Sequence, residues 1–260
     1  MKLKFKYKKQ DKNTTFADMI QLSIITPTYN SIQFIELCIT HVISHACSNI
    51  EHIIVDGGST DGTVEIIAQY AEKYSHIRWI SESDKGQCDA MNKGIQMAQA
   101  DYIGFLNVDD GYMQFTLQRV IALSKRYAQP VVLVGNCKLV DEQGNLIYIN
   151  RPSKLQAYHF YSGKEPYPIN PAAYFYHKAI HAHPKVGLYN TENHYSMDYE
   201  FMLKACVHFQ FIYFNEDWGY MVEHEAAKTS QDSTNIEKRK KELLEKYRQK
   251  VSFKIKFLSI

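Results

Sequence analysis

The sequence predicts an α/β fold with a mostly parallel central sheet flanked by helices. Between residues 22 and 106, short apolar runs rich in β-branched residues alternate with segments of helical periodicity. Glycine, proline, asparagine and aspartate separate these runs, as they do at breaks between strands and helices. The 260 residues are 45% hydrophobic and 22% charged, which suffices for one large domain and excludes disordered, collagen-like and low-complexity chains.

The first half of the chain contains four expected strands and three expected helices. The strands are at residues 22–26, 53–55, 77–80 and 102–106, and the helices at residues 32–44, 64–74 and 88–98. Strands that alternate with such helices form right-handed βαβ units, so the strands pair in parallel and helices cover both faces. Because these sheets bind ligands outside the carboxyl ends of their strands, functional residues are expected directly after each strand.

The second half is less regular, and we interpret it as an extension of the same domain. Strands are expected at residues 131–134, 146–149 and 209–214, a helix at residues 197–207, and a loop rich in proline and tyrosine at residues 160–176. No internal repeat with a period of 20–50 residues divides the chain.

Carboxylates follow three of the four strands of the first half. Asp56 follows the second strand, Asp84 the third, and Asp109 and Asp110 the fourth. Carboxylates that meet at one sheet edge repel one another unless a cation or hydrogen-bond donors offset their charge. A divalent cation that holds a phosphorylated ligand explains the pattern, since Mg²⁺ and Mn²⁺ bind one or two carboxylates together with phosphates. The dinucleotide-binding and P-loop glycine motifs are absent.

Four segments at these strand ends resemble, in order and spacing, the nucleotide-binding half of family 2 glycosyltransferases. The segments are LSIITPTYN, IIVDGGSTDGT, SESDKGQCDAMNKG and DYIGFLNVDD. The resemblance is dense over residues 22–115 and looser over residues 165–230. It implies a GT-A (Rossmann-like) fold and an inverting transfer of a sugar from a nucleotide diphosphate, in particular UDP, to a hydroxyl acceptor, with Mn²⁺ or Mg²⁺ as cofactor.

Three segments follow from this interpretation. Residues 1–20 form a basic N-terminal segment, residues 21–234 the glycosyltransferase domain, and residues 235–260 a basic amphipathic tail. In the domain, the nucleotide-binding half covers about residues 21–115 and the acceptor half about residues 116–234. The implied enzyme is a hexosyl- or N-acetylhexosaminyl-type transferase of surface polysaccharide or glycolipid synthesis, acting on a carbohydrate or lipid-linked carbohydrate acceptor.

The resemblance implies roles for residues of the nucleotide-binding half. Pro27 and Tyr29 would line the pocket for the base and the ribose. Asp56 would accept a hydrogen bond from uracil N3–H, and Asp84 would lie beside the nucleotide. Asp109 would contact both the nucleotide and the metal, as described next.

The metal-binding D-x-D motif of the family corresponds to Asn107-Val108-Asp109-Asp110. Its first aspartate is Asn107 here, which shifts the metal contact onto Asp109 and Asp110. The sequence leaves open which of the two binds the metal directly. A turn before the next helix is the alternative interpretation of this pair.

The segment Ser196–Phe201 resembles the family motif that supplies the catalytic base, which implies that role for Asp198. One base opposite the leaving diphosphate gives a single displacement with inversion. Glu200 is the nearby candidate for a nucleophile, but on a helix it lies on a different face, so only one of the two is expected to reach the sugar. Further candidates for diphosphate or acceptor contacts are Lys85, Asn92, Glu200 and His224.

Other interpretations remain open at this point. Asp61 fits a helix cap better than a ligand contact, and His177, His181 and His183 match no zinc spacing. A nucleotidyltransferase of similar fold would need a glycine-rich loop with Arg and Lys after the first strand, which TPTYNS lacks. A sheet that binds a nucleotide sugar or polysaccharide without turnover is the non-enzymatic alternative.

The charge of the chain is unevenly distributed. The formal net charge of +2 combines +5 in residues 1–12, −9 in residues 13–234 and +6 in residues 235–260. The near-zero total disfavours a dedicated nucleic-acid-binding protein. Residues 236–251 fit a basic amphipathic helix, whereas residues 2–8 and 253–257 alternate and fit edge strands or interfacial segments. The basic ends suggest peripheral contact with an anionic membrane.

Cysteine usage suggests a reducing compartment. The five cysteines (38, 47, 88, 137 and 206) form no C-x-x-C pair. The first residues contain no apolar run of signal-peptide length, and no run reaches the length of a membrane span. We therefore expect a cytoplasmic protein, with the inner face of the cytoplasmic membrane as a possible peripheral location.

Overall fold

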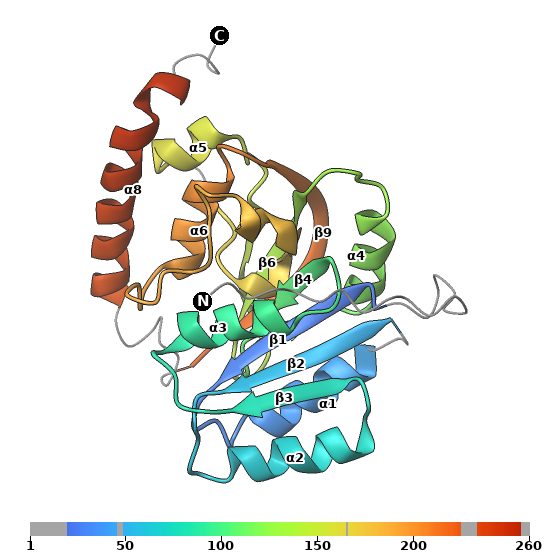
Figure 1. Cartoon of the computed structure of the whole chain (residues 1–260). Helices are drawn as coiled ribbons and strands as arrows, with labels where there is room; N and C mark the ends of the chain where they lie inside the picture. The colour runs from blue at the N-terminus through green and yellow to red at the C-terminus, as the bar shows by residue number, and fades with distance from the viewer. Residues whose placement is uncertain (1–19, 46–48, 165, 225–232, 256–260) are drawn as a thin grey trace, which may run out of the picture.

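The computed structural model describes residues 20–45, 49–164, 166–224 and 233–255. A nine-stranded sheet forms its centre, and helices cover both faces (Figure 1). The strand order is β3-β2-β1-β4-β8-β6-β9-β5, with β7 paired to β6. The structure confirms the predicted α/β class with a central sheet flanked by helices.

The first four strands pair in parallel. They are β1 (Leu22–Thr28), β2 (Ile50–Asp56), β3 (Ile77–Ser81) and β4 (Tyr102–Phe105), connected through α1 (Ile35–His45), α2 (Thr63–Lys73) and α3 (Gln87–Met97). Their carboxyl ends therefore lie along one edge of the sheet, as the βαβ pattern predicts.

The other strands add antiparallel pairs to the sheet. They are β5 (Gly111–Tyr112), β6 (Val131–Asp141), β7 (Leu146–Asn150), β8 (Tyr174–His177) and β9 (Gln210–Glu223). β8 runs antiparallel to β4 and β6, while β6 and β9 are parallel. Antiparallel neighbours arise here because the second half lacks regular crossover helices.

The expectation of a loop over residues 160–176 is wrong at both ends of that range. The range contains the end of α5 (Ala157–Ser162), the 3₁₀ turn η2 (Pro171–Ala173) and most of β8, a strand in the middle of the sheet. β8 escaped prediction because it is short and its residues Tyr174–Tyr176 are buried on both faces, so no polar alternation marks it.

Four further helical elements complete the described chain. They are α4 (Thr116–Ser124), the 3₁₀ helix η3 (Lys178–Ala182), α6 (Met197–Ala205) and α8 (Ser233–Ile255). Because α8 continues to Ile255, residues 253–255 are helical and the edge-strand expectation for them is wrong. The alternating residues 2–8 and residues 256–257 lie outside the described residues.

Alternation along the strands separates the core into two layers. Ile25 of β1 packs with α3 and α6 on one face, while Ile24 packs with α1 and α4 on the other. On the second face, α1 and α2 share a smaller cluster around Ile54 of β2. The helices thus fix the sheet from both sides and hold the strand ends in place.

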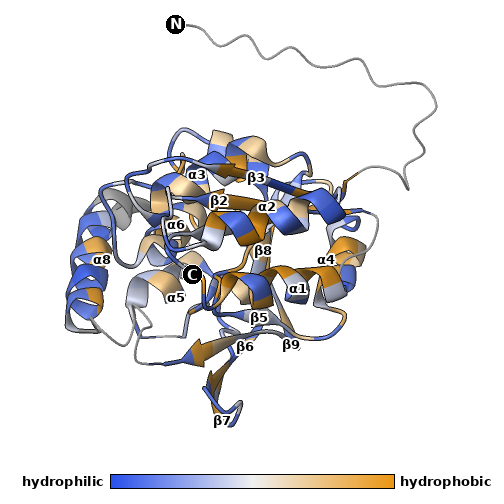
Figure 2. Ribbon diagram, turned by 90° about the horizontal axis from the view of Figure 1, so that it is seen from below, coloured by the Kyte–Doolittle hydropathy of each residue, from blue (hydrophilic) through white to orange (hydrophobic). Residues whose placement is uncertain are grey.

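Helix α8 packs on the domain through its apolar side. Leu243 is fully buried, and Leu244 packs against the same core. Arg248 donates hydrogen bonds to the carbonyls of Tyr161 (2.7 Å) and Ser162 (2.8 Å) at the end of α5. The apolar face that the sequence offers for a membrane is therefore used inside the protein, and the face that remains outward is mostly hydrophilic (Figure 2).

Within the described ranges, no helix combines the length and apolar character needed to cross a bilayer. The cysteines of these ranges, Cys38, Cys88, Cys137 and Cys206, are buried and carry free thiols.

Candidate active site

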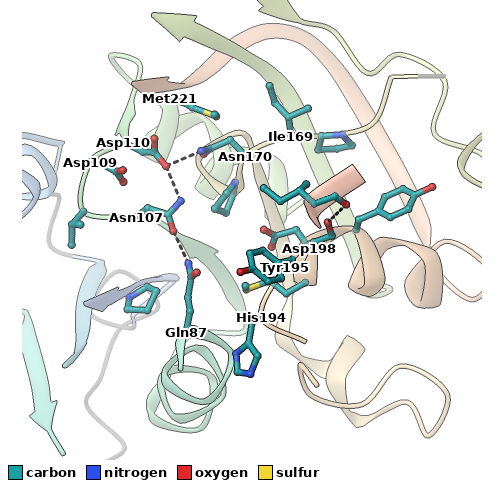
Figure 3. A pocket seen from close by; sticks show the side chains of 18 of the residues that line it. Gln87, Asn107, Asp109, Asp110, Ile169, Asn170, His194, Tyr195, Asp198 and Met221 are labelled. Atoms are coloured by element: carbon teal, nitrogen blue, oxygen red, sulfur yellow. Dashed lines mark hydrogen bonds between the residues drawn. The ribbon is translucent and has the colours of Figure 1, made fainter. Parts of the chain in front are cut away.

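A pocket of about 550 Å³ opens at the carboxyl ends of β1 and β4. The acidic turn after β4 lies on one side of it and the start of α6 on the other (Figure 3). The segment before η2 and the helix α8 supply further walls. Its lining includes Pro27, Tyr29, Gln87, Asn107, Asp109, Asp110, Tyr148, Tyr167, Asn170, His194, Tyr195, Asp198, Met221, Ile236 and Lys240.

Asp110 is the most enclosed carboxylate of the acidic turn, with 8% of its surface exposed. Its Oδ2 accepts hydrogen bonds from Nδ2 of Asn107 at 2.8 Å and from Nδ2 of Asn170 at 2.7 Å. Gln87 extends this chain by donating to Oδ1 of Asn107 at 3.1 Å (Figure 3). Burial, followed by the charge of Asp109, raises the pKa of Asp110, and the amide donors oppose that rise.

Asp109 is more open and faces both the pocket and the end of β9. A quarter of its side chain is exposed, and its Oδ2 lies 3.0 Å from Nε2 of His224. His224 itself is largely enclosed, and its ring lies 5.4 Å from that of Phe34. The pair connects the turn after β4 to the residue that follows β9.

A divalent cation fits this turn as a partner of two carboxylates. Asp109 and Asp110 are adjacent, and their mutual repulsion disfavours ionisation of Asp110. Among the described residues, no group of three or more His, Cys, Asp or Glu side chains lies close enough together to hold a metal ion. Asp109 and Asp110 supply carboxylate oxygens, which Mg²⁺ and Mn²⁺ accept together with substrate phosphates and water.

Asp198 lies at the other side of the pocket, in the first turn of α6. It is half-buried, and its Oδ1 accepts a hydrogen bond of 2.5 Å from the hydroxyl of Tyr174 in β8. Burial raises the pKa of the Asp198 carboxyl, and the hydrogen bond from Tyr174 lowers it again in part. A carboxylate held this way retains its second oxygen for a group in the pocket.

The predicted nucleotide residues fall into two groups. Pro27 and Tyr29 line the pocket, and the Tyr29 ring is 64% exposed. Asp56 is fully buried and Asp84 is half-buried, and neither contributes to the pocket lining. Oδ1 of Asp84 accepts from the backbone N–H of Gly86 at 2.7 Å.

The Asp56 carboxylate accepts four hydrogen bonds within the protein. Oδ2 accepts from the N–H groups of Gly58 (3.0 Å) and Ser59 (2.9 Å) and from Oγ of Ser81 (2.7 Å). Oδ1 accepts from Oγ of Ser59. These contacts fold the loop after β2 around the carboxylate, and only Oδ1 keeps free acceptor capacity.

Three further candidates lie away from the pocket lining. Both polar atoms of the Asn92 side chain pair with the backbone of Tyr189, at 2.9 Å each, and Lys85 is exposed. Glu200 is buried and accepts from Asn193 (2.8 Å) and Tyr247 (2.7 Å), so it fastens α6 to α8. Because the polar groups of Asn92 and Glu200 are used inside the protein, they are not available as ligand contacts.

Asp61 serves the loop and the helix start, although the N-cap residue of α2 is Gly62 and not Asp61. Its Oδ1 accepts from the backbone N–H and the hydroxyl of Thr63, the first residue of α2, and its Oδ2 accepts from the N–H of Ile32.

Sequence reasoning missed Gln87 and Asn170, which line the pocket, and Tyr174, which donates to Asp198 from behind the lining. Gln87 lies in a quoted motif, but its side chain gave no reason to expect it against Asn107. Asn170 and Tyr174 belong to the segment that was expected to be a loop. A strand prediction there would have placed them beside the end of β4, which is the signal that could have found them.

A second pocket, of about 630 Å³, lies between α1 and β9. It shares Val108, Asp109, Asp110 and Val222 with the first pocket, so the acidic turn forms the wall between the two. Its other lining includes Phe34, Leu37, Cys38, His41, Tyr220 and His224.

Comparison with known proteins gives a consistent result. The family model described as glycosyl transferase family 2 matches residues 23–183. A glycosyltransferase of Bacillus subtilis, EpsJ, is 33% identical over 136 residues, which are 52% of this chain and 38% of EpsJ.

Solved structures of glycosyltransferases share the fold. TarS of S. aureus (residues 1–349, in complex with UDP-GlcNAc) matches with a TM-score of 0.64 and 18% identity, over 81% of this chain and 61% of TarS. The mannosyltransferase PcManGT of Pyrobaculum calidifontis, in complex with GDP-Man and Mn²⁺, matches with a TM-score of 0.57 and 19% identity, over 80% of this chain and 58% of PcManGT. The chain spans less than two thirds of each of these three proteins.

Proposed function

Since the chain belongs to glycosyl transferase family 2, we propose that it transfers a sugar from a UDP-sugar to a hydroxyl of a carbohydrate or lipid-linked acceptor, with inversion. One observation carries this proposal: Asp109 and Asp110 lie on one side of a single pocket and Asp198 on the other. In a sugar transfer the leaving diphosphate needs its negative charge stabilised, and the attacking hydroxyl needs a base that accepts its proton. The two sides of the pocket can supply these two functions.

The donor end of the pocket is formed by Pro27, Tyr29 and the acidic turn. The exposed Tyr29 ring offers a face on which a base can stack, and Asp56 keeps one acceptor site on Oδ1. The uridine preference rests on the motif and on TarS, whose structure contains UDP-GlcNAc. A hexosyl or N-acetylhexosaminyl donor is the corresponding proposal for the sugar.

Asp109 is the better candidate for direct metal contact. Asp110 is held by Asn107 and Asn170, whereas Asp109 is partly exposed to the pocket. A bound Mn²⁺ or Mg²⁺ would neutralise charge on the leaving diphosphate. PcManGT, whose structure is a complex with GDP-Man and Mn²⁺, supports a divalent cation as cofactor by similarity.

Asp198 acts as the base in this proposal. Burial raises its pKa, and a carboxylate that is partly desolvated accepts a hydroxyl proton more readily. As the acceptor oxygen attacks the anomeric carbon from the side of Asp198, the proton passes to the carboxylate and the diphosphate leaves on the opposite side. With Glu200 turned away from the pocket, a single displacement with inversion is favoured over two.

The part of the pocket near Asp198, which we assign to the acceptor, is lined by aromatic side chains and one lysine. Tyr148, Tyr167 and Tyr195 line it, and such rings suit the apolar faces of sugars. Lys240 of α8 lies 5.3 Å from the centroid of the Tyr167 ring and 2.7 Å from Oε1 of Glu237. This lining supports a carbohydrate acceptor in surface polysaccharide or glycolipid synthesis.

Contact with an anionic membrane remains part of the proposal in a modified form. Because the apolar side of α8 is packed against the domain, attraction must come from its outward cations. Lys238 and Lys241 are exposed on this helix.

Asp198→Asn tests the proposed function. Donors are first selected by thermal shift from UDP-glucose, UDP-galactose, UDP-GlcNAc and GDP-mannose with Mn²⁺, and UDP or GDP release is then measured. The variant should still bind the donor but release nucleoside diphosphate at least 100-fold more slowly. Asp101→Asn, an exposed carboxylate outside the pocket, is the control and should behave as the wild type.

Unchanged turnover by Asp198→Asn would remove this residue from the mechanism. Release of pyrophosphate from a nucleoside triphosphate would instead identify a nucleotidyltransferase. Donor binding without any turnover by the wild type, with a range of oligosaccharide acceptors, would indicate a binding protein.

A further inference from the structure

Buried tyrosine side chains and one histidine lie in a row behind Asp198, on the side away from the pocket. Tyr174, Tyr176 and Tyr189 are at most 5% exposed, and His181 lies beside them. Tyr174 donates to Oδ1 of Asp198 at 2.5 Å. The hydroxyls of Tyr176 and Tyr189 are 3.2 Å apart, and the Tyr176 hydroxyl lies 2.9 Å from Nε2 of His181.

The direction of these hydrogen bonds follows from the far end of the row. Nδ1 of His181 lies 2.9 Å from the carbonyl oxygen of Gly187, which can only accept, so Nδ1 carries the proton. Burial lowers the pKa of His181 to about 4, so the ring is neutral near pH 7 and its Nε2 is an acceptor. Tyr176 therefore donates to His181.

The remaining two hydroxyl protons are then fixed in turn. The proton of Tyr176 is used on His181, so its oxygen is free to accept from Tyr189. The proton of Tyr189 therefore points to the oxygen of Tyr176, and the Asp198 carboxylate, which can only accept, takes the proton of Tyr174. Each hydroxyl therefore donates its proton to one defined acceptor.

We propose that Tyr174 is a positioning residue for the base of the transfer reaction, with its ring stacked on Tyr176 of the hydrogen-bonded row Tyr189, Tyr176 and His181. This inference rests on the proposed function of Asp198. Tyr174 occupies Oδ1 and leaves Oδ2 as the one oxygen that takes the acceptor proton. It also fixes the carboxylate plane relative to β8, a central strand of the sheet.

A proton relay along the same row is the competing interpretation, and His181 argues against it. A relay would end on Nε2 of His181 and would leave a buried imidazolium. The pKa of His181 is lowered to about 4 by burial, so this form is disfavoured near pH 7. The proton on Asp198 leaves more readily through the open pocket.

Other charged groups around Asp198 act more weakly or point elsewhere. Tyr167 faces it from the segment before η2, and Lys240 and Glu237 of α8 lie beyond Tyr167 and pair with each other. On its own helix, Glu200 turns to Asn193 and Tyr247. Tyr174 is thus the residue whose hydrogen bond favours the ionised form of Asp198.

The test compares Tyr174→Phe with a matched control, Tyr161→Phe. Tyr161 is also buried, and its hydroxyl donates to the carbonyl of Leu203 on the same helix, α6, without contact to Asp198. Each variant loses one buried hydrogen bond and keeps its ring. The pH dependence of UDP release from UDP-GlcNAc with Mn²⁺ is measured for both, and ¹³C NMR follows the Asp198 carboxyl against pH, assigned by its absence in Asp198→Asn.

In Tyr174→Phe, the acidic limb of the rate profile should move to higher pH. On that limb the rate should be about tenfold lower than in the wild type, and it should recover in alkaline solution. The cause is the loss of the hydrogen bond that stabilises the ionised carboxylate of Asp198. The ¹³C titration of Asp198 should move in the same direction. Tyr161→Phe should leave both curves in place.

Identical curves for the two tyrosine variants would overturn the positioning role. The NMR titration separates these outcomes even where turnover is slow. Inactive Asp198→Asn with an unshifted titration in Tyr174→Phe rejects the positioning role alone. Full activity of Asp198→Asn rejects the base itself, and with it the proposed mechanism.

Discussion

Asn170 and Asp110 are 60 residues apart in the sequence, and Nδ2 of Asn170 donates a hydrogen bond of 2.7 Å to Oδ2 of Asp110. The other end of the same amide, Oδ1, accepts from the backbone N–H of Ala172 at 2.8 Å. One side chain therefore connects the acidic turn after β4 with η2, the turn that leads into β8. A side chain that both donates and accepts is required for this arrangement.

Replacement of Asn170 should destabilise the protein in a way that depends on the substitute. Asn170→Ala leaves Asp110 and the Ala172 N–H without this partner, and the free energy of unfolding should fall by about 1–3 kcal/mol. Asn170→Asp faces Asp110 with a second carboxylate, so its additional loss should grow between pH 5 and pH 8. Urea unfolding at both pH values measures this, and equal losses at the two values would contradict the role assigned to the amide.

Asn107→Asp restores the first aspartate of the family motif, and we expect it to make stability depend on metal. In the wild type, Nδ2 of Asn107 donates to Oδ2 of Asp110 at 2.8 Å, and an aspartate here brings two carboxylates together. Without metal the variant should lose about 1–3 kcal/mol of stability. Melting temperatures in EDTA and in Mn²⁺ should differ more for the variant than for the wild type. Equal differences would speak against a cation at this turn.

His224→Ala should weaken the use of metal while leaving the fold intact. His224 lies 3.0 Å from Oδ2 of Asp109, and a partner that orients a metal ligand commonly affects affinity by about 10–100-fold. We expect the Mn²⁺ concentration for half-maximal turnover to rise by that factor. His183→Ala serves as the control because His183 stacks on His208, away from the pocket. An unchanged Mn²⁺ response in His224→Ala would show that His224 does not support metal binding by Asp109.

His52 should contribute to acid sensitivity. It is fully buried, its Nε2 lies 2.9 Å from Oγ1 of Thr26, and burial together with His76 lowers its pKa to about 3. The unfolded chain binds a proton near the ordinary value of 6.5 while the folded chain does not, so stability is present above pH 6.5 and is lost as the pH falls. His41 and His181, whose pKa values are also lowered to about 4, contribute in the same direction.

His52→Gln isolates this contribution because the other histidines remain. Between pH 7 and pH 5, the wild type should lose about 2 kcal/mol more unfolding free energy than the variant. Urea titrations at several pH values measure the two slopes. Parallel slopes would show that His52 is protonated in the folded protein.

The outward lysines of α8 should control binding to anionic vesicles. Each cation near such a surface contributes ~1 kcal/mol, so the double variant Lys238→Gln/Lys241→Gln should bind about 30-fold more weakly. Co-sedimentation with phosphatidylcholine vesicles, with and without phosphatidylserine, measures this. Lys73→Gln/Lys125→Gln removes two cations elsewhere and should bind as the wild type. An equal loss of vesicle binding in both double variants would show that only the net charge of the protein matters.

Local pattern predicted the nucleotide-binding half well, because its topology is local. Each strand there is followed by its own helix, so the residues after β1 and β4 reach one sheet edge by the handedness of βαβ units. The pattern predicted Asp109 and Asp110 at this edge for that reason, and the family resemblance added the roles of Pro27 and Tyr29; all four line the pocket. Asp198 was assigned by motif alone, and the structure places it across the pocket from them.

The antiparallel half could not be assembled from local pattern. β8 lies between β4 and β6, partners about 70 and 40 residues earlier in the chain, and nothing in its four residues specifies that placement. Asn170 and Tyr174 depend on it, and so both were missed. The amphipathic pattern of α8 was recognised correctly, but periodicity does not say whether the apolar face meets a lipid surface or the rest of the protein.

The packing of α8 on the domain has a consequence for the order in which the pocket is completed. Ile236 and Lys240 line the pocket, and they leave the ribosome after every other residue that lines it. A nascent chain that has emerged only to the end of β9 already contains the acidic turn and Asp198, yet the side that α8 closes is still open. The cleft is therefore completed only after α8 has been synthesised, and a chain that stops before Ser233 carries Asp109, Asp110 and Asp198 without the wall that α8 supplies.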